Sequence, residues 1–291
     1  MKKLLASLAL IFIYLLSFGQ GKIIESIVIH SKILAKDVRY SIYLPADYDA
    51  AQRRYPVLYL LHGYSDDETG WTQFGEVQKI TDETIAKGDA TQMIIAMPDA
   101  GVSWYINDAS GKVPYEDFFI KEFIPYIDSV YKTRSKKEFR AVAGLSMGGY
   151  GSLIYAMKHP DLFTACAPLS AAIWNDDHIA GLPAADWKNY KLNELFGSNA
   201  EGKKRLTETW YKNSVLKLAI STPAEKLNEV RFYIDCGDDD FLIKGNMELH
   251  ALLTDQKVTH EFRVRDGAHN WVYWRSALPE VLKFVSESFH R

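Results

Sequence analysis

Two segments near the start of the chain alternate apolar and polar residues, which is the pattern of strands with one exposed face. They run from Ile23 to His30 and from Val38 to Leu44. In the second segment the apolar residues recur at every other position, at Val38, Tyr40, Ile42 and Leu44. The sequence therefore predicts an antiparallel pair of strands at the beginning of the domain.

Further along, the alternation gives way to short, solidly apolar runs separated by stretches with helical periodicity. Such runs are typical of strands that are buried on both faces, so the pattern predicts an α/β fold with a mostly parallel central sheet and helices on both of its faces. The predicted strands are Val57 to Leu61, Met93 to Met97, Phe139 to Ala143, Phe163 to Leu169, Val230 to Asp235 and the more mixed Glu261 to Val264.

The stretches between these strands carry apolar residues at helical spacing. We expect helices from Phe74 to Lys87, from Tyr115 to Tyr131 with a kink at Pro125, and from Ile243 to Leu253. A last helix is expected over 277–289, starting near its proline at position 279. Together the strands and helices account for most of the chain as one domain.

About fifty residues, 171–222, do not fit this alternation. A connection this long usually carries function or helices of its own. We expect a cap-like excursion over the carboxyl edge of the sheet, with helices near Leu192 to Phe196 and Ala200 to Leu218.

Residues 1–19 have the layout of a secretory signal peptide. Lys2 and Lys3 precede an apolar run from Leu4 to Phe18, and small residues follow. The run is shorter than the roughly 20 residues that span a bilayer. We expect cleavage after Gly19, a single domain over 20–291, and a secreted or periplasmic protein; the alternative is a retained N-terminal anchor.

Composition and charge narrow the function classes. The 34 Lys and Arg residues against 37 Asp and Glu residues give a formal charge of −3, so the chain lacks the basic field that gathers nucleic acid or anionic lipid. No zinc pattern is present, and we expect neither a metal nor a cofactor. The acidic run from Asp66 to Glu68 is expected to be a solvated loop rather than a calcium site. The two cysteines, Cys166 and Cys236, are expected to be buried free thiols.

The sharpest motif is Gly-Leu-Ser-Met-Gly at 144–148, which directly follows a predicted strand and precedes an apolar helix. G-x-S-x-G at a strand-to-helix turn presents a nucleophilic serine on a strained backbone, and the small glycines let the turn close. The pattern therefore predicts Ser146 as the nucleophile. A serine hydroxyl also needs a base and an orienting carboxylate, which come later in the chain in this fold.

His269 is the late histidine that lies just beyond the carboxyl end of a predicted strand, unlike His250, His260 and His290. We therefore predict it as the base. For the carboxylate, Asp240 is preferred because its position leaves the loop room to turn back toward the histidine. The alternatives are the two preceding residues, Asp239 and Asp238, whereas Asp266 is expected to stabilise the histidine loop.

The negative charge that develops during acyl transfer needs two backbone N–H donors. The residue after the nucleophile, Met147, is one candidate, and Tyr64 in the loop after Leu61 is the other. In the same loop His62 is expected to be a buried imidazole that braces the backbone.

These motifs occur in the order His62-Gly63-Tyr64 with Trp71, Gly144 to Gly151, Cys236 to Asp240, and Gly267 to Trp271. As a set they resemble the esterase D-like family of α/β-hydrolases, which includes feruloyl and acetyl xylan esterases, tributyrin esterases, S-formylglutathione hydrolases and mycolyltransferases. The resemblance implies an α/β-hydrolase fold over about 23–289. It also implies a triad of Ser146, His269 and Asp240, with Tyr64 and Met147 as oxyanion donors.

Export and the many aromatic residues near these motifs favour carbohydrate esterases over their relatives. The expected reaction is hydrolysis of carboxylic esters through an acyl-enzyme, on feruloyl or acetyl groups of an acylated saccharide. Aromatic rings suit both sugars and a feruloyl group, and the predicted substrate contacts are Trp71, Trp104, Trp174 and Trp271. The alternatives are a thioesterase similar to S-formylglutathione hydrolases, an acyltransferase, or a glycan-binding module without activity, which the intact triad disfavours.

Overall fold

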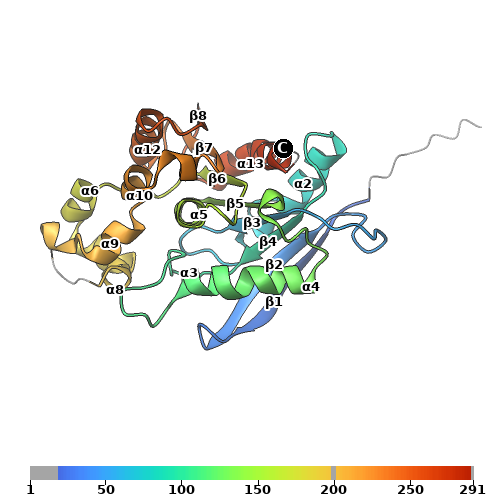
Figure 1. Ribbon diagram of the computed structural model, residues 1–291, viewed down its shortest axis with the longest axis horizontal. Helices are drawn as coiled ribbons and strands as arrows, with labels where there is room; N and C mark the ends of the chain where they lie inside the picture. The colour runs from blue at the N-terminus through green and yellow to red at the C-terminus, as the bar shows by residue number, and fades with distance from the viewer. Residues whose placement is uncertain (1–18, 198–200, 290–291) are drawn as a thin grey trace, which may run out of the picture.

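The computed structural model describes residues 19–197 and 201–289, so the predicted signal peptide lies outside the described residues except for Gly19. The described chain contains one eight-stranded sheet with the strand order β1-β2-β4-β3-β5-β6-β7-β8 (Figure 1). The strands are β1 (Lys22–Ser31), β2 (Lys36–Leu44), β3 (Val57–Leu61), β4 (Ile94–Pro98), β5 (Arg140–Leu145), β6 (Ala165–Leu169), β7 (Arg231–Gly237) and β8 (His260–Arg265).

Strand direction follows the sequence pattern. β1 pairs with β2, and β2 with β4, in antiparallel fashion, whereas every pairing from β4 through β3, β5, β6 and β7 to β8 is parallel. The antiparallel start and the mostly parallel sheet are both confirmed. The central strands β3 to β6 are buried along their whole length, which is why they lack the alternation seen in β2.

Helices cover both faces of the sheet, as predicted (Figure 1). Successive residues of β3 divide between the two faces: Tyr59 and Leu61 join one apolar cluster, and Leu58 and Leu60 join the other. The first cluster packs under α3 (Tyr115–Phe118), α4 (Ile124–Val130), α5 (Met147–Lys158) and α12 (Ile243–Asp255). The second packs under α2 (Val77–Ala86) and α13 (Trp271–Ser288).

Helix boundaries differ from the prediction at three places. The helix expected from position 74 begins only at Val77, as α2, because Glu76 directly before it has a left-handed backbone, and a separate short helix, α1 (Gly70–Gln73), precedes it. A π-helical turn, η1 (Phe119–Phe123), ends two residues before Pro125, the residue at which we expected a kink. The last helix begins eight residues before Pro279, because the Asn270 side chain accepts a hydrogen bond from the Tyr273 N–H and caps an earlier start.

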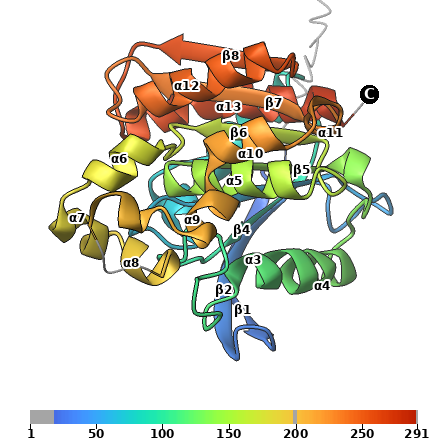
Figure 2. The same ribbon diagram turned by 60° about the vertical axis from the view of Figure 1, so that its left-hand side comes forward.

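The long excursion forms a group of short helices at one end of the sheet (Figure 2). They are α6 (Asp176–Gly181), α7 (Ala184–Asn189), α8 (Leu192–Leu195), η3 (Gly202–Arg205), α9 (Glu208–Asn213) and α10 (Val215–Ser221), and α11 (Ala224–Leu227) then leads to β7. The single helix expected from position 200 to Leu218 is instead broken at Ser214, whose backbone is extended. The cap of Thr207 on the Trp210 N–H gives α9 a separate start.

Both cysteines lie in adjacent buried strands. Cys166 in β6 and Cys236 in β7 are free thiols, as predicted. None of the helices in residues 19–197 and 201–289 is long and apolar enough to cross a membrane.

Candidate active site

Ser146 occupies the tight turn between β5 and α5. Its backbone is in a strained conformation, with φ at +53° and ψ at −113°. The flanking glycines are required by close packing, because a Cβ atom at Gly144 would approach the Gly148 backbone to 2.6 Å and one at Gly148 would approach the Leu61 carbonyl oxygen to 2.4 Å. The turn that carries Ser146 therefore packs directly against the end of β3.

Ser146, His269 and Asp240 form a continuous hydrogen-bonded relay. The His269 Nε2 atom lies 2.9 Å from the Ser146 Oγ, and the His269 Nδ1 atom lies 2.8 Å from the Asp240 Oδ2. With an ionised Asp240, Nδ1 carries the proton and donates a hydrogen bond to the carboxylate, which leaves Nε2 free to accept a hydrogen bond from the serine hydroxyl. The arrangement can take a proton from Ser146 as its oxygen attacks.

The other late histidines lie apart from this relay. His250 in α12 and His260 in β8 form a hydrogen-bonded pair, with 2.7 Å between Nδ1 and Nε2. His290 lies outside the described residues.

Of the three consecutive aspartates, the structure brings Asp240 to the histidine. Burial raises the pKa of the Asp240 carboxyl, but hydrogen bonds from His269, the Leu242 N–H and Ser170 outweigh that effect and hold the pKa below its usual value. Asp238 and Asp239 are exposed, and the Asp238 carboxylate accepts hydrogen bonds from the N–H groups of Gly267 and Asp239 instead. Asp266, also exposed, lies beside this pair, with carboxylate oxygens of all three within 4.8 Å.

A buried carboxylate that the sequence did not single out supports the two loops that carry Asp240 and His269. Asp235 in β7 is fully buried and accepts hydrogen bonds from Tyr233 and Tyr273. It also pairs with Arg265 at the end of β8, at 3.1 and 3.2 Å. Because β7, β8 and α13 meet at this one side chain, it fixes the ends from which both loops leave.

The loop after β3 passes beside Ser146. A Cβ atom at Gly63 would lie 3.8 Å from the Ser146 Cβ. His62 is buried, and its Nε2 accepts from the Ala100 N–H at 2.9 Å while its Nδ1 contacts the Gly63 carbonyl at 2.8 Å. Burial lowers the pKa of this imidazole, which favours the neutral form that these two bonds require. His62 thus braces the loop, as expected, and Tyr64 follows directly.

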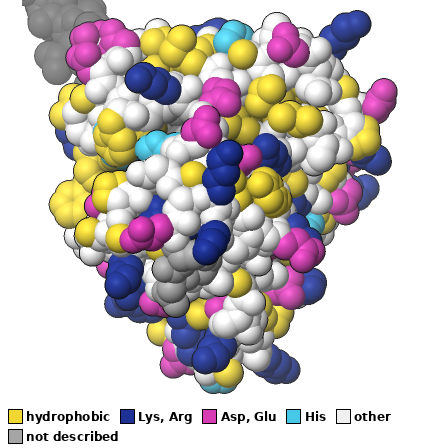
Figure 3. All heavy atoms as spheres, turned by 90° about the vertical axis from the view of Figure 1, so that its left-hand side faces the viewer, with side chains coloured by type: hydrophobic (Ala, Val, Ile, Leu, Met, Phe, Trp, Pro, Cys, Tyr) yellow, Lys and Arg dark blue, Asp and Glu magenta, His cyan; other side chains and the backbone are white. Residues whose placement is uncertain are grey.

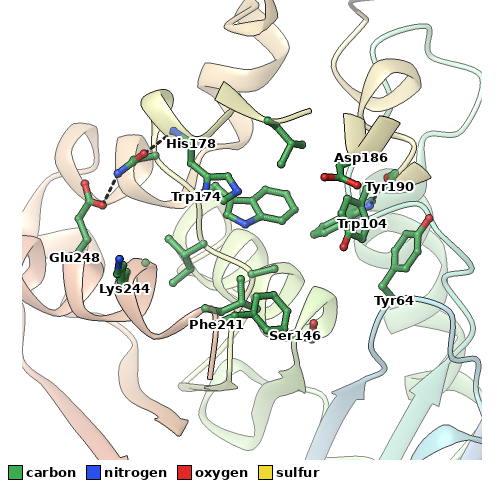
Figure 4. Close-up of a pocket in the computed structure, with 16 residues that line it drawn as sticks. Tyr64, Trp104, Ser146, Trp174, His178, Asp186, Tyr190, Phe241, Lys244 and Glu248 are labelled. Atoms are coloured by element: carbon green, nitrogen blue, oxygen red, sulfur yellow. Dashed lines mark hydrogen bonds between the residues drawn. The ribbon is translucent and has the colours of Figure 1, made fainter. Parts of the chain in front are cut away.

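A pocket of about 370 Å³ opens next to Ser146 (Figure 4). Trp104 and Trp174, two of the predicted contacts, line it with their ring centroids 5.0 Å apart. The Tyr64 and Tyr190 rings lie beside these tryptophans, with 5.4 Å between the two tyrosine ring centroids. The remaining lining residues are Ala172, Ile173, Asn175, His178, Leu182, Asp186, Phe241, Leu242, Lys244, Gly245 and Glu248.

The structure does not place Trp71 and Trp271 in this lining. Trp71 is 1% exposed and donates its Nε1–H to the Leu61 carbonyl, so it belongs to the core beneath the loop. Trp271 packs edge-on against Trp71 and Trp274, at 5.3 Å in each case. A tryptophan close to a motif in the sequence can face the core as readily as the pocket.

Several lining residues were missed by the sequence analysis. Phe241 follows Asp240 directly, remains 73% exposed and holds its ring 4.6 Å from that of His269. Lys244 and Glu248 lie one helical turn apart on α12, a spacing that could have indicated a shared face. Tyr190 and Asp186 come from the excursion, whose path no local pattern predicts.

The acidic run after the β3 loop is held by protein groups. Thr69 donates its backbone N–H and its hydroxyl to Asp67, and the buried Glu68 accepts from Ser26 and lies 3.4 Å from Arg39. Asp66 is partly buried, and desolvation raises the pKa of its carboxyl to about 6. The run is thus less solvated than we expected.

Comparison with protein families gives one match that spans most of the chain. The model of the family described as "Putative esterase" matches residues 31–285. An acetyl esterase from Caldicellulosiruptor saccharolyticus is 26% identical over 276 residues, which cover 89% of this chain and 96% of that protein. An endo-1,4-beta-xylanase/feruloyl esterase from Xylanibacter ruminicola is 33% identical over 163 residues, 54% of this chain and 22% of that longer protein.

Solved structures agree with this match. A ferulic acid esterase is 34% identical and superposes with a TM-score of 0.79. The superposition covers 93% of this chain and 99% of that one. FphF, a fluorophosphonate-binding serine hydrolase from Staphylococcus aureus, is 25% identical with a TM-score of 0.77, over 92% of this chain and 99% of that one.

Proposed function

The chain belongs to the Putative esterase family, and from that premise we propose that it is an exported serine hydrolase that cleaves carboxylic esters of acylated saccharides. The observation that carries the proposal is the relay from Asp240 through His269 to Ser146, with heavy-atom distances of 2.8 and 2.9 Å. Family membership supports ester hydrolysis, and the relay supplies a chemistry for it without any added cofactor.

In the proposed reaction, His269 accepts the hydroxyl proton as the Ser146 Oγ attacks the ester carbonyl carbon. The tetrahedral intermediate collapses when the imidazolium returns that proton to the alcohol oxygen, which leaves an acyl group on Ser146. Water then attacks the acyl-enzyme by the same steps, and the acid is released. Asp240, ionised and buried, holds the imidazole in the required tautomer and stabilises its charged form.

We assign the oxyanion to the backbone N–H groups of Met147 and Tyr64. Met147 is the first residue of α5, where the free N–H groups of a helix start favour negative charge. Tyr64 follows the glycine that lies beside Ser146. One such donor contributes on the order of 3 kcal/mol to the transition state, so the position of the β3 loop matters as much as a triad residue.

The pocket favours an aromatic acyl group over acetate. A volume of about 370 Å³ exceeds what a two-carbon acyl group fills, and the rings of Trp104, Trp174, Tyr64 and Tyr190 offer flat apolar surfaces. Two of the similar proteins are named for feruloyl or ferulic acid esters and one for acetyl esters. We therefore propose a hydroxycinnamoyl group such as feruloyl.

Secretion or export to the periplasm is proposed on the N-terminal sequence. Residues 1–19 combine two lysines, an apolar run and a small-residue end. Mass spectrometry of protein recovered outside the cytoplasm tests this: an N-terminus at residue 20 is expected, and an intact Met1 would contradict it.

The experiment that tests the proposed activity measures ferulate and acetate release from matched feruloyl and acetyl esters of one sugar, with Ser146→Ala as the blank. Faster ferulate release is expected. Turnover by the Ser146→Ala protein would contradict the serine mechanism, and acetate release alone would contradict the aromatic acyl pocket.

A further inference from the structure

A second hollow, of about 350 Å³, adjoins the pocket beside Ser146. The two share Asn175 and Glu248, whose side chains are joined by a 3.0 Å hydrogen bond from the amide nitrogen to the carboxylate. We infer that this second hollow binds the saccharide chain attached to the alcohol half of the ester. The inference rests on the proposed ester hydrolysis and assigns a site to the half of the substrate that the aromatic pocket leaves out.

The direction of the leaving alcohol follows from His269. The imidazole has to donate its proton to the alcohol oxygen, so the alcohol departs on the His269 side of the Ser146 Oγ. Phe241 lines that side: its ring lies 4.6 Å from the imidazole ring and is 73% exposed. An exposed apolar ring beside the catalytic base is suited to contact the carbon face of a sugar.

From Phe241, one face of α12 leads away from Ser146. Phe241, Lys244 and Glu248 all line the first pocket, and Figure 4 shows them at increasing distance from the serine. The next position on this face, Leu252, lines the second hollow together with Glu248. At 1.5 Å per residue the eight helical steps from Lys244 to Leu252 span about 12 Å, which is enough for more than one sugar ring.

The opposite wall of the second hollow comes from the excursion. Asp176 and Asp177 begin α6, and Lys217 and Ile220 belong to α10. The Asp176 carboxylate is occupied, because it lies 2.9 Å from the Lys217 ammonium and accepts from the Trp210 Nε1–H at 3.0 Å. Ile220 is 50% exposed at this wall and adds an apolar contact.

The chemistry of the lining fits a neutral polyhydroxyl ligand. The carboxylates of Asp177 and Glu248 can accept hydrogen bonds from sugar hydroxyls, and the Asn175 amide can both donate and accept hydrogen bonds. Ser214 adds a hydroxyl that is 1% exposed and has no hydrogen-bond partner among the described residues. Acidic and basic side chains are interspersed on the face that carries α6 and α9 (Figure 3), so no single-sign field selects a charged ligand there.

The test compares two esters that share an acyl group and differ in the alcohol: methyl ferulate and a feruloylated arabinoxylo-oligosaccharide. The wild-type enzyme is expected to show a higher kcat/KM for the oligosaccharide ester, mainly through a lower KM. In the double variant Asp177→Ala with Ile220→Ala, the ratio of the two kcat/KM values should fall about threefold to tenfold, the size expected for the loss of one solvent-exposed hydrogen bond and one apolar contact. Leu252→Trp, which fills the hollow, should lower the same ratio.

Met247→Ala is the matched control, because Met247 is 53% exposed on α12 but lines neither hollow, and it should leave the ratio at the wild-type value. Equal kcat/KM values for the two esters in the wild type, or a ratio that the hollow variants leave unchanged, would overturn the inference while turnover of methyl ferulate leaves the proposed function standing. Absence of turnover on both esters and on the acetyl counterparts would overturn the proposed function and the inference with it.

Discussion

The Nε2 atom of His269 lies 2.9 Å from the Oγ of Ser146, although 123 positions separate the two residues in the chain. The contact exists because the parallel strands β5 and β8 end at the same edge of the sheet, so that the loops which follow them converge there. A strained turn positions Ser146, and a loop that ends at the Asn270 cap of α13 positions His269.

Replacing the carboxylate of the relay tests the choice among the three aspartates. Asp240→Asn should reduce kcat by about 10³ to 10⁴-fold, because the amide no longer holds the imidazole tautomer in which Nε2 accepts a proton. Steady-state kinetics on a soluble ester measures the effect. Asp239→Asn is the matched control, because Asp239 precedes Asp240 in the same loop but is exposed, and it should retain activity within about a factor of two. Equal losses in the two variants would contradict the assignment.

His62 is predicted to act on the reaction through the backbone of the β3 loop. His62→Ala removes both hydrogen bonds that brace this loop, to the Ala100 N–H and the Gly63 carbonyl. Because the Tyr64 N–H would then lose its position, we expect kcat to fall about tenfold to a hundredfold while KM changes little. A rise in KM with an unchanged kcat would show that the loop serves ground-state binding instead.

The aromatic pocket predicts a change in acyl preference. Trp174→Ala should lower the ratio of kcat/KM for feruloyl over acetyl esters by about tenfold. The substitution removes a ring that lines the pocket and that we expect to contact the feruloyl group. Trp271→Ala should leave this ratio unchanged, because Trp271 packs against Trp71 outside the pocket. The prediction is wrong if both variants shift the ratio alike.

Asp66 is expected to make stability depend on pH. Burial raises the pKa of its carboxyl from 3.8 to about 6, so the folded protein binds this proton more tightly than the unfolded chain does. The resulting stabilisation is present below pH 3.8 and is lost as the pH rises through about 6. Asp66→Asn, which stays neutral, should therefore raise Tm at pH 8 by a few degrees.

Thermal unfolding followed by circular dichroism at pH 8 and at about pH 3.5 measures the effect. The Tm difference between Asp66→Asn and the wild type should disappear at about pH 3.5, where the wild-type carboxyl is protonated. A constant difference at both pH values would mean that the substitution acts through packing rather than charge.

The parts of this structure that could be predicted are those that a local pattern determines. Buried runs such as Val57 to Leu61 can form only interior strands, and the serine motif at a strand-to-helix junction marks Ser146 without any knowledge of the rest. The end of each strand also limits where a late histidine can reach the serine, which is why the sequence predicts His269 as the base.

What could not be predicted depends on the path of the chain in space. Trp71 and Trp104 both follow strand ends in the sequence, yet one faces the core and the other the pocket, since the loops turn in different directions. The lining residue Tyr190 and the break at Ser214 belong to an excursion whose packing sets its helix ends. Asp235 was missed because it lies inside a buried strand and its partners Arg265 and Tyr273 come from other elements.

Covalent capture of the nucleophile tests the central claim most directly. The wild-type protein, Ser146→Ala and His269→Ala are incubated with a fluorophosphonate, and the intact masses and the labelled peptide are measured. The account predicts one adduct on Ser146 in the wild type, none in Ser146→Ala and a labelling rate reduced by at least about 10³-fold in His269→Ala. An unlabelled wild-type protein, or a label on another residue that persists in Ser146→Ala, would contradict it.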